Sequence, residues 1–159
     1  MDLIDYRIMV GNAQRILIHL PSGIESERVR RIQEKVSACF PNGQMEFLIL
    51  ESFPAESRML LQADPNDSVN LIHKKDIRFF RTFKKNIIQM LKHKQFDLIL
   101  DFSKTFDITF AHAFRATGAP VIAGLFADAK SDIFYNLLIK VTDARSFDDS
   151  LFHCLAQMK

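Results

Sequence analysis

The chain has 159 residues, of which 48% are hydrophobic and 25% are charged, and its formal net charge is +2. This length supports one domain with a substantial core, and the composition excludes an intrinsically disordered chain. The two cysteines, Cys39 and Cys154, stand far apart and fit neither a disulfide framework nor a metal-binding spacing. We therefore expect free thiols in the cytoplasm, with no metal and no cofactor.

The distribution of charged and apolar residues argues against two further classes of protein, those with a signal peptide and those that span a membrane. Asp2 and Asp5 stand where a signal peptide has basic residues followed by an unbroken apolar run. No segment has the roughly 20 consecutive apolar residues that a membrane-spanning helix requires. The expected protein is neither exported by a signal peptide nor inserted in a membrane.

The first third of the chain alternates between apolar runs and one amphipathic segment. Residues 1–10 fit a short helix, or alternatively a strand, so that residues 1–14 form an N-terminal helix or arm. Residues 15–20 are the first expected core strand. Ser22 and Glu25 have the spacing of a capping box, which predicts a helix that ends before Pro41. A second strand is expected at Met45–Leu50.

A long loop and a basic segment follow. Residues 51–68 contain two prolines and several Asp and Asn, which predicts a loop with a turn or two of helix at 55–62. A third strand is expected at Val69–His73. Asp76 then has the position of a cap for a helix over residues 77–94, whose inward face would hold Ile77, Phe80, Phe83, Ile87, Met90 and Leu91.

Residues 96–126, FDLILDFSKTFDITFAHAFRATGAPVIAGLF, are typical of a βαβ unit. An apolar strand ends at Asp101, an amphipathic helix spans about 106–117, and Gly118 with Pro120 ends it before a second buried strand. Residues 134–141 fit a strand or a helix, and we favour a strand because the turn at 143–146 leads into a last helix, Phe147–Met158. The alternation predicts a three-layer Rossmann-like α/β sandwich, a single domain over residues 1–159 with a mainly parallel sheet of five to six strands.

In such a sheet, ligands bind where the strands end at their carboxyl termini. This rule selects the candidate ligand-binding residues His19, Ser22, Gly23, Asp101, Ser103 and Lys104, with His73 and the segment 124–128 at the same edge. Asp101 could accept a ligand hydroxyl or act as a base. The structural alternative is favoured: Asp101 or Ser103 bonds to the turn, and Thr105 or Asp107 caps the next helix.

The motifs of several known chemistries are absent. Only Gly23 occupies the place where a dinucleotide fingerprint needs three glycines, and there is no GxxxxGK[ST] or GxSxG. The acidic pair of a phospho-receiver domain is replaced by His19-Leu20-Pro21-Ser22. His19 and His73 would form a pair only if their strands were neighbours, and packed or solvent-facing histidines are the favoured alternative.

Positive charge gathers in one segment. Residues 74–94 contain eight Lys or Arg and one Asp, a net of +7, in a chain whose total is +2. The basic surface is expected at Lys74, Lys75, Arg78, Arg81, Lys85 and Lys92. Such a surface can contact phosphates of nucleic acid or acidic lipid, but a solvated helix face is favoured, since an RNA-binding surface normally adds exposed aromatics and only Phe79 is a candidate.

The segments FDLILDFS, TGAPVIAGLF and FYNLLIKV, with the terminal amphipathic helix, resemble a family of short bacterial proteins of unknown function. The resemblance covers about residue 92 to the C-terminus and carries no catalytic residues with it. The same segment is more distantly similar to the amino-terminal Rossmann-like half of heptosyltransferase-like GT-B glycosyltransferases. In those enzymes the second Rossmann half holds most of the nucleotide-sugar donor, and this chain is too short to contain one.

These observations favour a non-catalytic binding or interaction module with a small-molecule or protein partner and no membrane partner, and homo-oligomer formation stays open. One alternative is a binder or small enzyme for a phosphorylated or nucleotide-sugar ligand at the carboxyl edge of the sheet. Another is weak association with nucleic acid through the expected basic helix, which is the less favoured partner.

Overall fold

A computed structural model of the chain describes residues 5–126, 133–141 and 146–158. Its sheet has six strands: β1 (Arg15–His19), β2 (Gln44–Leu50), β3 (Ser68–Ile72), β4 (Leu98–Asp101), β5 (Val121–Leu125) and β6 (Leu137–Ile139). The helices are α1 (Tyr6–Gly11), α2 (Ser26–Cys39), α3 (Ala55–Gln62), α4 (Lys85–His93), α5 (Ile108–Thr117) and α6 (Phe147–Gln157), with a 3₁₀ turn, η1, at Lys74–Asp76.

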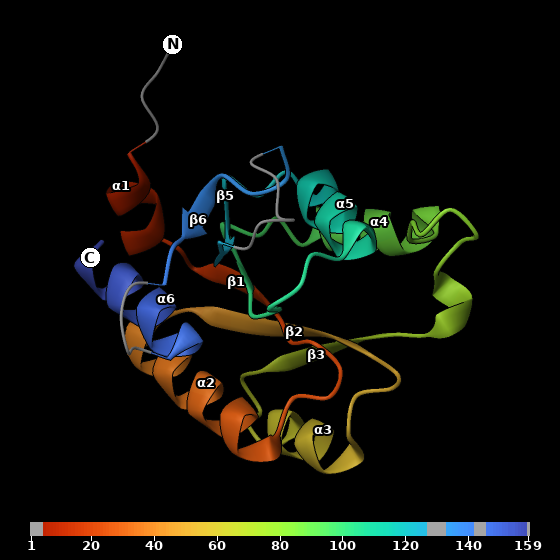
Figure 1. Ribbon diagram of the computed structural model, residues 1–159, viewed down its shortest axis with the longest axis horizontal. Coiled ribbons are helices and arrows are strands. Elements are labelled where there is room, and N and C mark those ends of the chain that lie inside the picture. Colours follow the sequence, from red (N-terminus) through yellow and green to blue (C-terminus); the bar gives the residue numbers. More distant parts are fainter. Residues whose placement is uncertain (1–4, 127–132, 142–145, 159) are drawn as a thin grey trace.

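All six strands are parallel, in the order β3-β2-β1-β4-β5-β6. Helices α2, α3 and α6 lie below the sheet in Figure 1, and α4 and α5 lie above it. The expected three-layer Rossmann-like architecture is confirmed. The order of the strands reverses between β1 and β4, which places the switch point of the fold at the carboxyl ends of these two neighbours.

Each face of the sheet has its own hydrophobic cluster, which explains why the central strands are continuous apolar runs. Ile16 and Ile18 of β1 belong to the cluster under α2, α3 and α6, whereas Leu17 belongs to the cluster under α4 and α5. The ion pair between Arg28 of α2 and Asp148 of α6 ties two helices of the first face together. The Arg28 Nε and Nη2 atoms each lie 2.7 Å from an Asp148 oxygen, and Asp148 is buried.

A glycine fixes the turn between α2 and β2. A Cβ atom at Gly43 would lie 3.0 Å from Ile16 Cδ1 and 3.0 Å from Phe40 Cβ. A Cβ at Gly11 would meet only the Met158 carbonyl oxygen at 3.7 Å, an ordinary contact. A side chain in the turn after α2 would therefore require its neighbours to move by a few tenths of an ångström, whereas one at the end of α1 would make only ordinary contacts.

The predicted helix over residues 77–94 is wrong in its first half. Asp76 caps η1, where its carboxylate accepts the backbone N–H of His73 at 3.0 Å, and Ile77 is extended. Ile77 then forms an antiparallel bridge with Phe83, and the helix begins only at Lys85. Phe80 and Met90, both expected to face inward, are exposed.

The predicted capping box is also wrong, because α2 starts after Glu25 without a side-chain cap and the Ser22 hydroxyl instead pairs with Ser52. The other elements are confirmed within a few residues, including the strand within 134–141 and the short helix at 55–62. The predictions for residues 1–4, 127–128 and 143–145 lie outside the described residues. Among the described helices, none combines the length and apolar character needed to cross a membrane.

Candidate functional site

The candidate site lies at the switch point, where β1 and β4 end side by side. His19 is the last residue of β1, and the register of the sheet pairs it with Asp101, the last residue of β4. The chain thus brings together two titratable side chains that are 82 residues apart. This juxtaposition follows from the strand order and not from any local motif.

Asp101 is the centre of a hydrogen-bond network that we call the Asp101 network. One carboxylate oxygen lies 2.8 Å from His19 Nδ1 and accepts both the backbone N–H and the hydroxyl of Ser103, at 3.0 and 2.6 Å. The other oxygen accepts the Tyr135 hydroxyl at 2.5 Å. Both carboxylate oxygens are therefore bonded to side chains of the protein.

The network is enclosed. His19, Asp101, Ser103 and Tyr135 are 3%, 1%, 5% and 2% exposed. The His19 ring stacks on Phe110 of α5, with ring centroids 3.9 Å apart, so an apolar helix covers this side of the network. A carboxylate buried this deeply is stable because four donors or potential donors surround it.

Burial has a direct chemical effect on Tyr135. Loss of solvation, followed by the charge of Asp101 and the hydrogen bond to it, raises the pKa of Tyr135 far above its usual range. The phenol is held as a neutral hydrogen-bond donor and does not act as a base near neutral pH. Together the four side chains hold the ends of β1 and β4 in place.

The remaining predicted ligand-binding residues lie outside the network. Ser22 and Gly23 are exposed in the loop after β1, and Gly23 has a φ of +79°, which favours glycine. The Ser22 hydroxyl lies 2.9 Å from that of Ser52, in the loop after β2. Lys104 is exposed just beyond β4. The favoured structural roles are confirmed, since Asp101 bonds the turn and Asp107 caps α5 through the Thr109 N–H.

The two strand-end histidines do not converge, because β2 separates β1 from β3. His73 instead lies 2.9 Å from the Glu51 carboxylate, which also accepts the Lys74 backbone N–H at 2.9 Å. The Lys74 N–H first, and then the hydrogen bond from His73, lower the pKa of Glu51. His73 and Glu51 thus form a second polar pair, more exposed than the Asp101 network, at the carboxyl edge of the sheet.

Sequence reasoning missed Tyr135, the residue that closes the network. Its position between β5 and β6 carries no motif, and its partner lies 34 residues away. The available signal was its chemistry: the chain has only two tyrosines, and a buried tyrosine normally needs a partner for its hydroxyl. The identity of that partner depends on the strand order.

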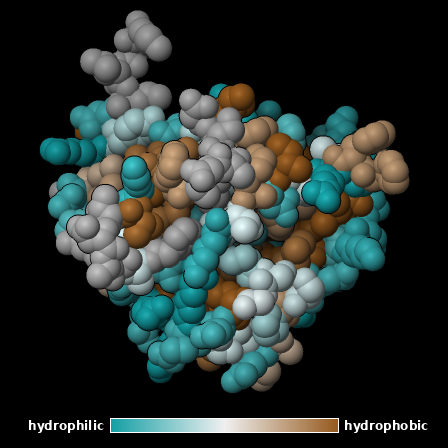
Figure 2. Space-filling view, viewed as in Figure 1, coloured by the Kyte–Doolittle hydropathy of each residue, from teal (hydrophilic) through white to brown (hydrophobic). Residues whose placement is uncertain are grey.

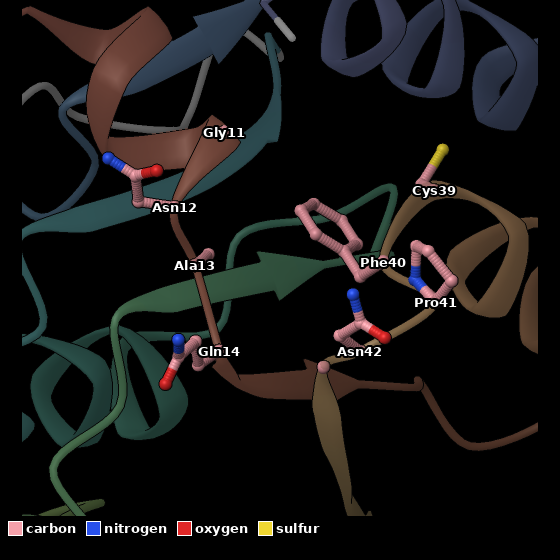
Figure 3. Close-up of a pocket in the computed structure, with 9 residues that line it drawn as sticks. Gly11, Asn12, Ala13, Gln14, Cys39, Phe40, Pro41 and Asn42 are labelled. Atoms are coloured by element: carbon pink, nitrogen blue, oxygen red, sulfur yellow. The ribbon is translucent and has the colours of Figure 1, made fainter.

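A partly open cavity lies at the opposite edge of the sheet, before β1 and β2 begin. Its volume is about 320 Å³, and residues 11–14 and 39–43 line it. Figure 3 shows the side-chain amides of Asn12, Gln14 and Asn42 around it, with the rings of Phe40 and Pro41. The lining carries no carboxylate, histidine or cation, so the cavity has no acid–base group to add to the Asp101 network.

Comparison with known proteins supports the architecture. No family model matches the sequence, and no curated protein matches it. Among solved structures, the chain is similar to the glycosyl transferase family 9 protein from Veillonella parvula DSM 2008, with a TM-score of 0.56 and 16% identity. The similarity covers 91% of this chain but only 41% of that one, so this chain spans about two fifths of the transferase's length. At this identity the match establishes a shared Rossmann-like α/β fold over the matched region.

Proposed function

We propose that this chain is a non-catalytic binding module whose fold corresponds to one half of a GT-B-like glycosyltransferase. The observation that supports this most is the closed Asp101 network. His19, Asp101 and Ser103 are the side chains best placed for catalysis, yet they bond to one another under Phe110 and Tyr135. A general base must reach its substrate within hydrogen-bond distance, which these buried groups do not offer.

The earlier resemblance agrees with this proposal. The amino-terminal half of heptosyltransferase-like enzymes is similar to the segment from about residue 92 to the C-terminus, and the solved structural neighbour is itself named a glycosyl transferase. The same residues resemble the short bacterial family of unknown function. Neither resemblance carries catalytic residues onto His19 or Asp101, which supports a binding role.

The test is a direct search for turnover. Wild-type protein and Asp101→Asn are incubated with nucleotide sugars, and nucleotide release is followed by chromatography. A non-catalytic module gives the background rate in both samples. Release that is faster than background with wild type and lost in Asp101→Asn, while circular dichroism shows both folded, would contradict the proposal.

A second candidate is binding of a phosphorylated or nucleotide-sugar ligand at the carboxyl edge. The exposed hydroxyls of Ser22 and Ser52, held 2.9 Å apart beside the switch point, support it because they can bond phosphate or sugar oxygens. A ligand well above its Kd raises Tm by several degrees by mass action. The shift should shrink in Ser22→Ala but not in the matched control Asn42→Ala at the opposite edge, and no shift with wild type at millimolar ligand would remove this candidate.

A further inference from the structure

The segment that was expected to begin a helix forms a tight hairpin. The Arg81 N–H donates to the Arg78 carbonyl at 3.0 Å, and the Arg78 N–H donates to the Thr82 carbonyl at 2.7 Å. Arg81 has a φ of +52°, in the left-handed region that few side chains adopt, and Ile77 pairs with Phe83 below it. The backbone therefore defines a β-turn, the Arg78–Arg81 turn, with the sequence Arg-Phe-Phe-Arg.

The two central residues of this turn are exposed phenylalanines. Phe79 is 95% exposed and Phe80 is 84% exposed, whereas Phe83 at the base is buried against Phe110. In Figure 2 a tan, hydrophobic projection stands out at the upper right, and Figure 1 shows the connection from η1 to α4 on the same side. The fold anchors the base of the hairpin and leaves two large apolar rings in water, which is unfavourable unless a partner covers them.

Cations surround the two rings. Between residues 74 and 85 there are six Lys or Arg and a single acid, Asp76, which is buried. All six are exposed, and within the described ranges none of them forms an ion pair. They are Lys74, Lys75, Arg78, Arg81, Lys84 and Lys85. The surface thus combines an apolar tip with an uncompensated positive flank.

We propose that the Arg78–Arg81 turn docks on an anionic lipid surface. Phe79 and Phe80 enter the boundary between headgroups and acyl chains, and the flanking cations lie at the depth of the lipid phosphates. Apolar burial and attraction to anionic headgroups add in such interfacial binding. This mode needs no helix that spans a membrane, because only the tip of the turn leaves water.

The ring geometry distinguishes this partner from single-stranded nucleic acid. Stacking on successive bases requires aromatic faces that are roughly parallel. The Phe79 and Phe80 rings are instead edge to face, with an interplanar angle of 85° and centroids 5.5 Å apart. In this arrangement the two rings do not offer parallel faces to successive bases, whereas an apolar wedge in a lipid interface needs no parallel faces.

The chain contains no tryptophan, so Phe80→Trp places a single fluorescent reporter at the tip. The proposal predicts a blue shift and a higher intensity with vesicles of phosphatidylcholine plus phosphatidylglycerol. Phosphatidylcholine alone should produce little change, and salt should weaken the response because the flank is electrostatic. No shift with the anionic vesicles would overturn the proposal.

A vesicle flotation assay with variants that carry no tryptophan reporter distinguishes binding through this surface from non-specific hydrophobic adsorption and from an effect of net charge. Phe79→Ser combined with Phe80→Ser should reduce the bound fraction about tenfold, and Arg78→Gln combined with Lys85→Gln should reduce it to a similar extent. The matched controls are Met59→Ser, an exposed apolar residue on α3, and Arg30→Gln, an exposed cation on α2. Equal losses in the controls, or displacement of vesicles by a single-stranded oligonucleotide at lower concentration than by soluble headgroup, would contradict lipid docking.

Discussion

Tyr135→Phe is the sharpest test of whether the Asp101 network is a structural clamp. The substitution removes one oxygen atom and keeps the ring in its packed position. In the wild type that hydroxyl is buried and donates at 2.5 Å to the Asp101 carboxylate. Without it, one oxygen of a carboxylate that is 1% exposed loses a donor that water cannot easily replace.

The expected loss can be estimated from the chemistry of this bond. A hydrogen bond to a charged group contributes about 1.5–3 kcal/mol net, so we expect the free energy of unfolding to fall by about 2 kcal/mol. Domains of this kind are stable by about 5–15 kcal/mol, so the variant should still fold. With an m-value of about 2 kcal/mol/M, the urea midpoint should fall by about 1 M.

The assay is urea unfolding followed by far-UV circular dichroism. The matched control is Tyr6→Phe, the other tyrosine, which is partly exposed on α1 and whose hydroxyl bonds to no described residue. This control should shift the free energy of unfolding by less than about 0.5 kcal/mol. If Tyr135→Phe behaves like the control, the network is not a closed clamp, and the reason for excluding His19 and Asp101 from catalysis fails with it.

Three further outcomes follow from packing and titration. Gly43→Ala should lower the free energy of unfolding in urea by about 1–3 kcal/mol, since its methyl group would overpack the turn. The control Gly11→Ala should leave it unchanged, and equal effects of the two substitutions would contradict the contacts at Gly43. Asp148→Asn should lose about 3 kcal/mol, because it leaves the guanidinium of Arg28 without its bidentate partner, and an unchanged urea midpoint would refute this. The raised pKa of Tyr135 means that stability is fully present below the unfolded tyrosine pKa of about 10 and declines above it. The absorbance of ionised tyrosine in wild type should therefore exceed that in Tyr135→Phe only once alkaline unfolding begins, and an earlier excess would contradict the burial of this phenol.

The fold was largely predictable because buried parallel strands leave a clear pattern. β1, β2 and β4 are largely apolar, although β2 contains the buried Glu46, and turn residues bound them, so the sequence locates each within about two residues. The candidate site could be predicted only in part. His19 and Asp101 could be assigned to one edge of the sheet, but their contact depends on β1 and β4 being neighbours, which no local pattern states.

The predicted helix does not form over residues 77–84, for a physical reason that the sequence pattern does not show. Ile77, Phe80 and Phe83 recur every three residues, which fits a helix face, yet only Phe83 is buried in the core. Two local interactions override the helical periodicity: Asp76 caps η1, and the Lys84 N–H donates to the Asp76 carbonyl at 2.8 Å, closing the hairpin. Tertiary and turn contacts of this kind routinely outweigh helix propensity, which differs by less than about 1 kcal/mol among ordinary residues.

The Asp101 network and the Arg78–Arg81 turn differ in what a partner would have to replace. A ligand that reached Asp101 would first have to break bonds to His19, Ser103 and Tyr135, each of which is already satisfied in the folded state. A partner of the turn would displace only water from two rings and from cations that form no ion pair with a described residue. Binding at the switch point would therefore break existing hydrogen bonds, whereas binding at the turn would remove apolar rings from water and bring these cations near a partner. Phe83 contacts Phe110, and Phe110 stacks on His19, so packed rings connect the base of the hairpin to the Asp101 network.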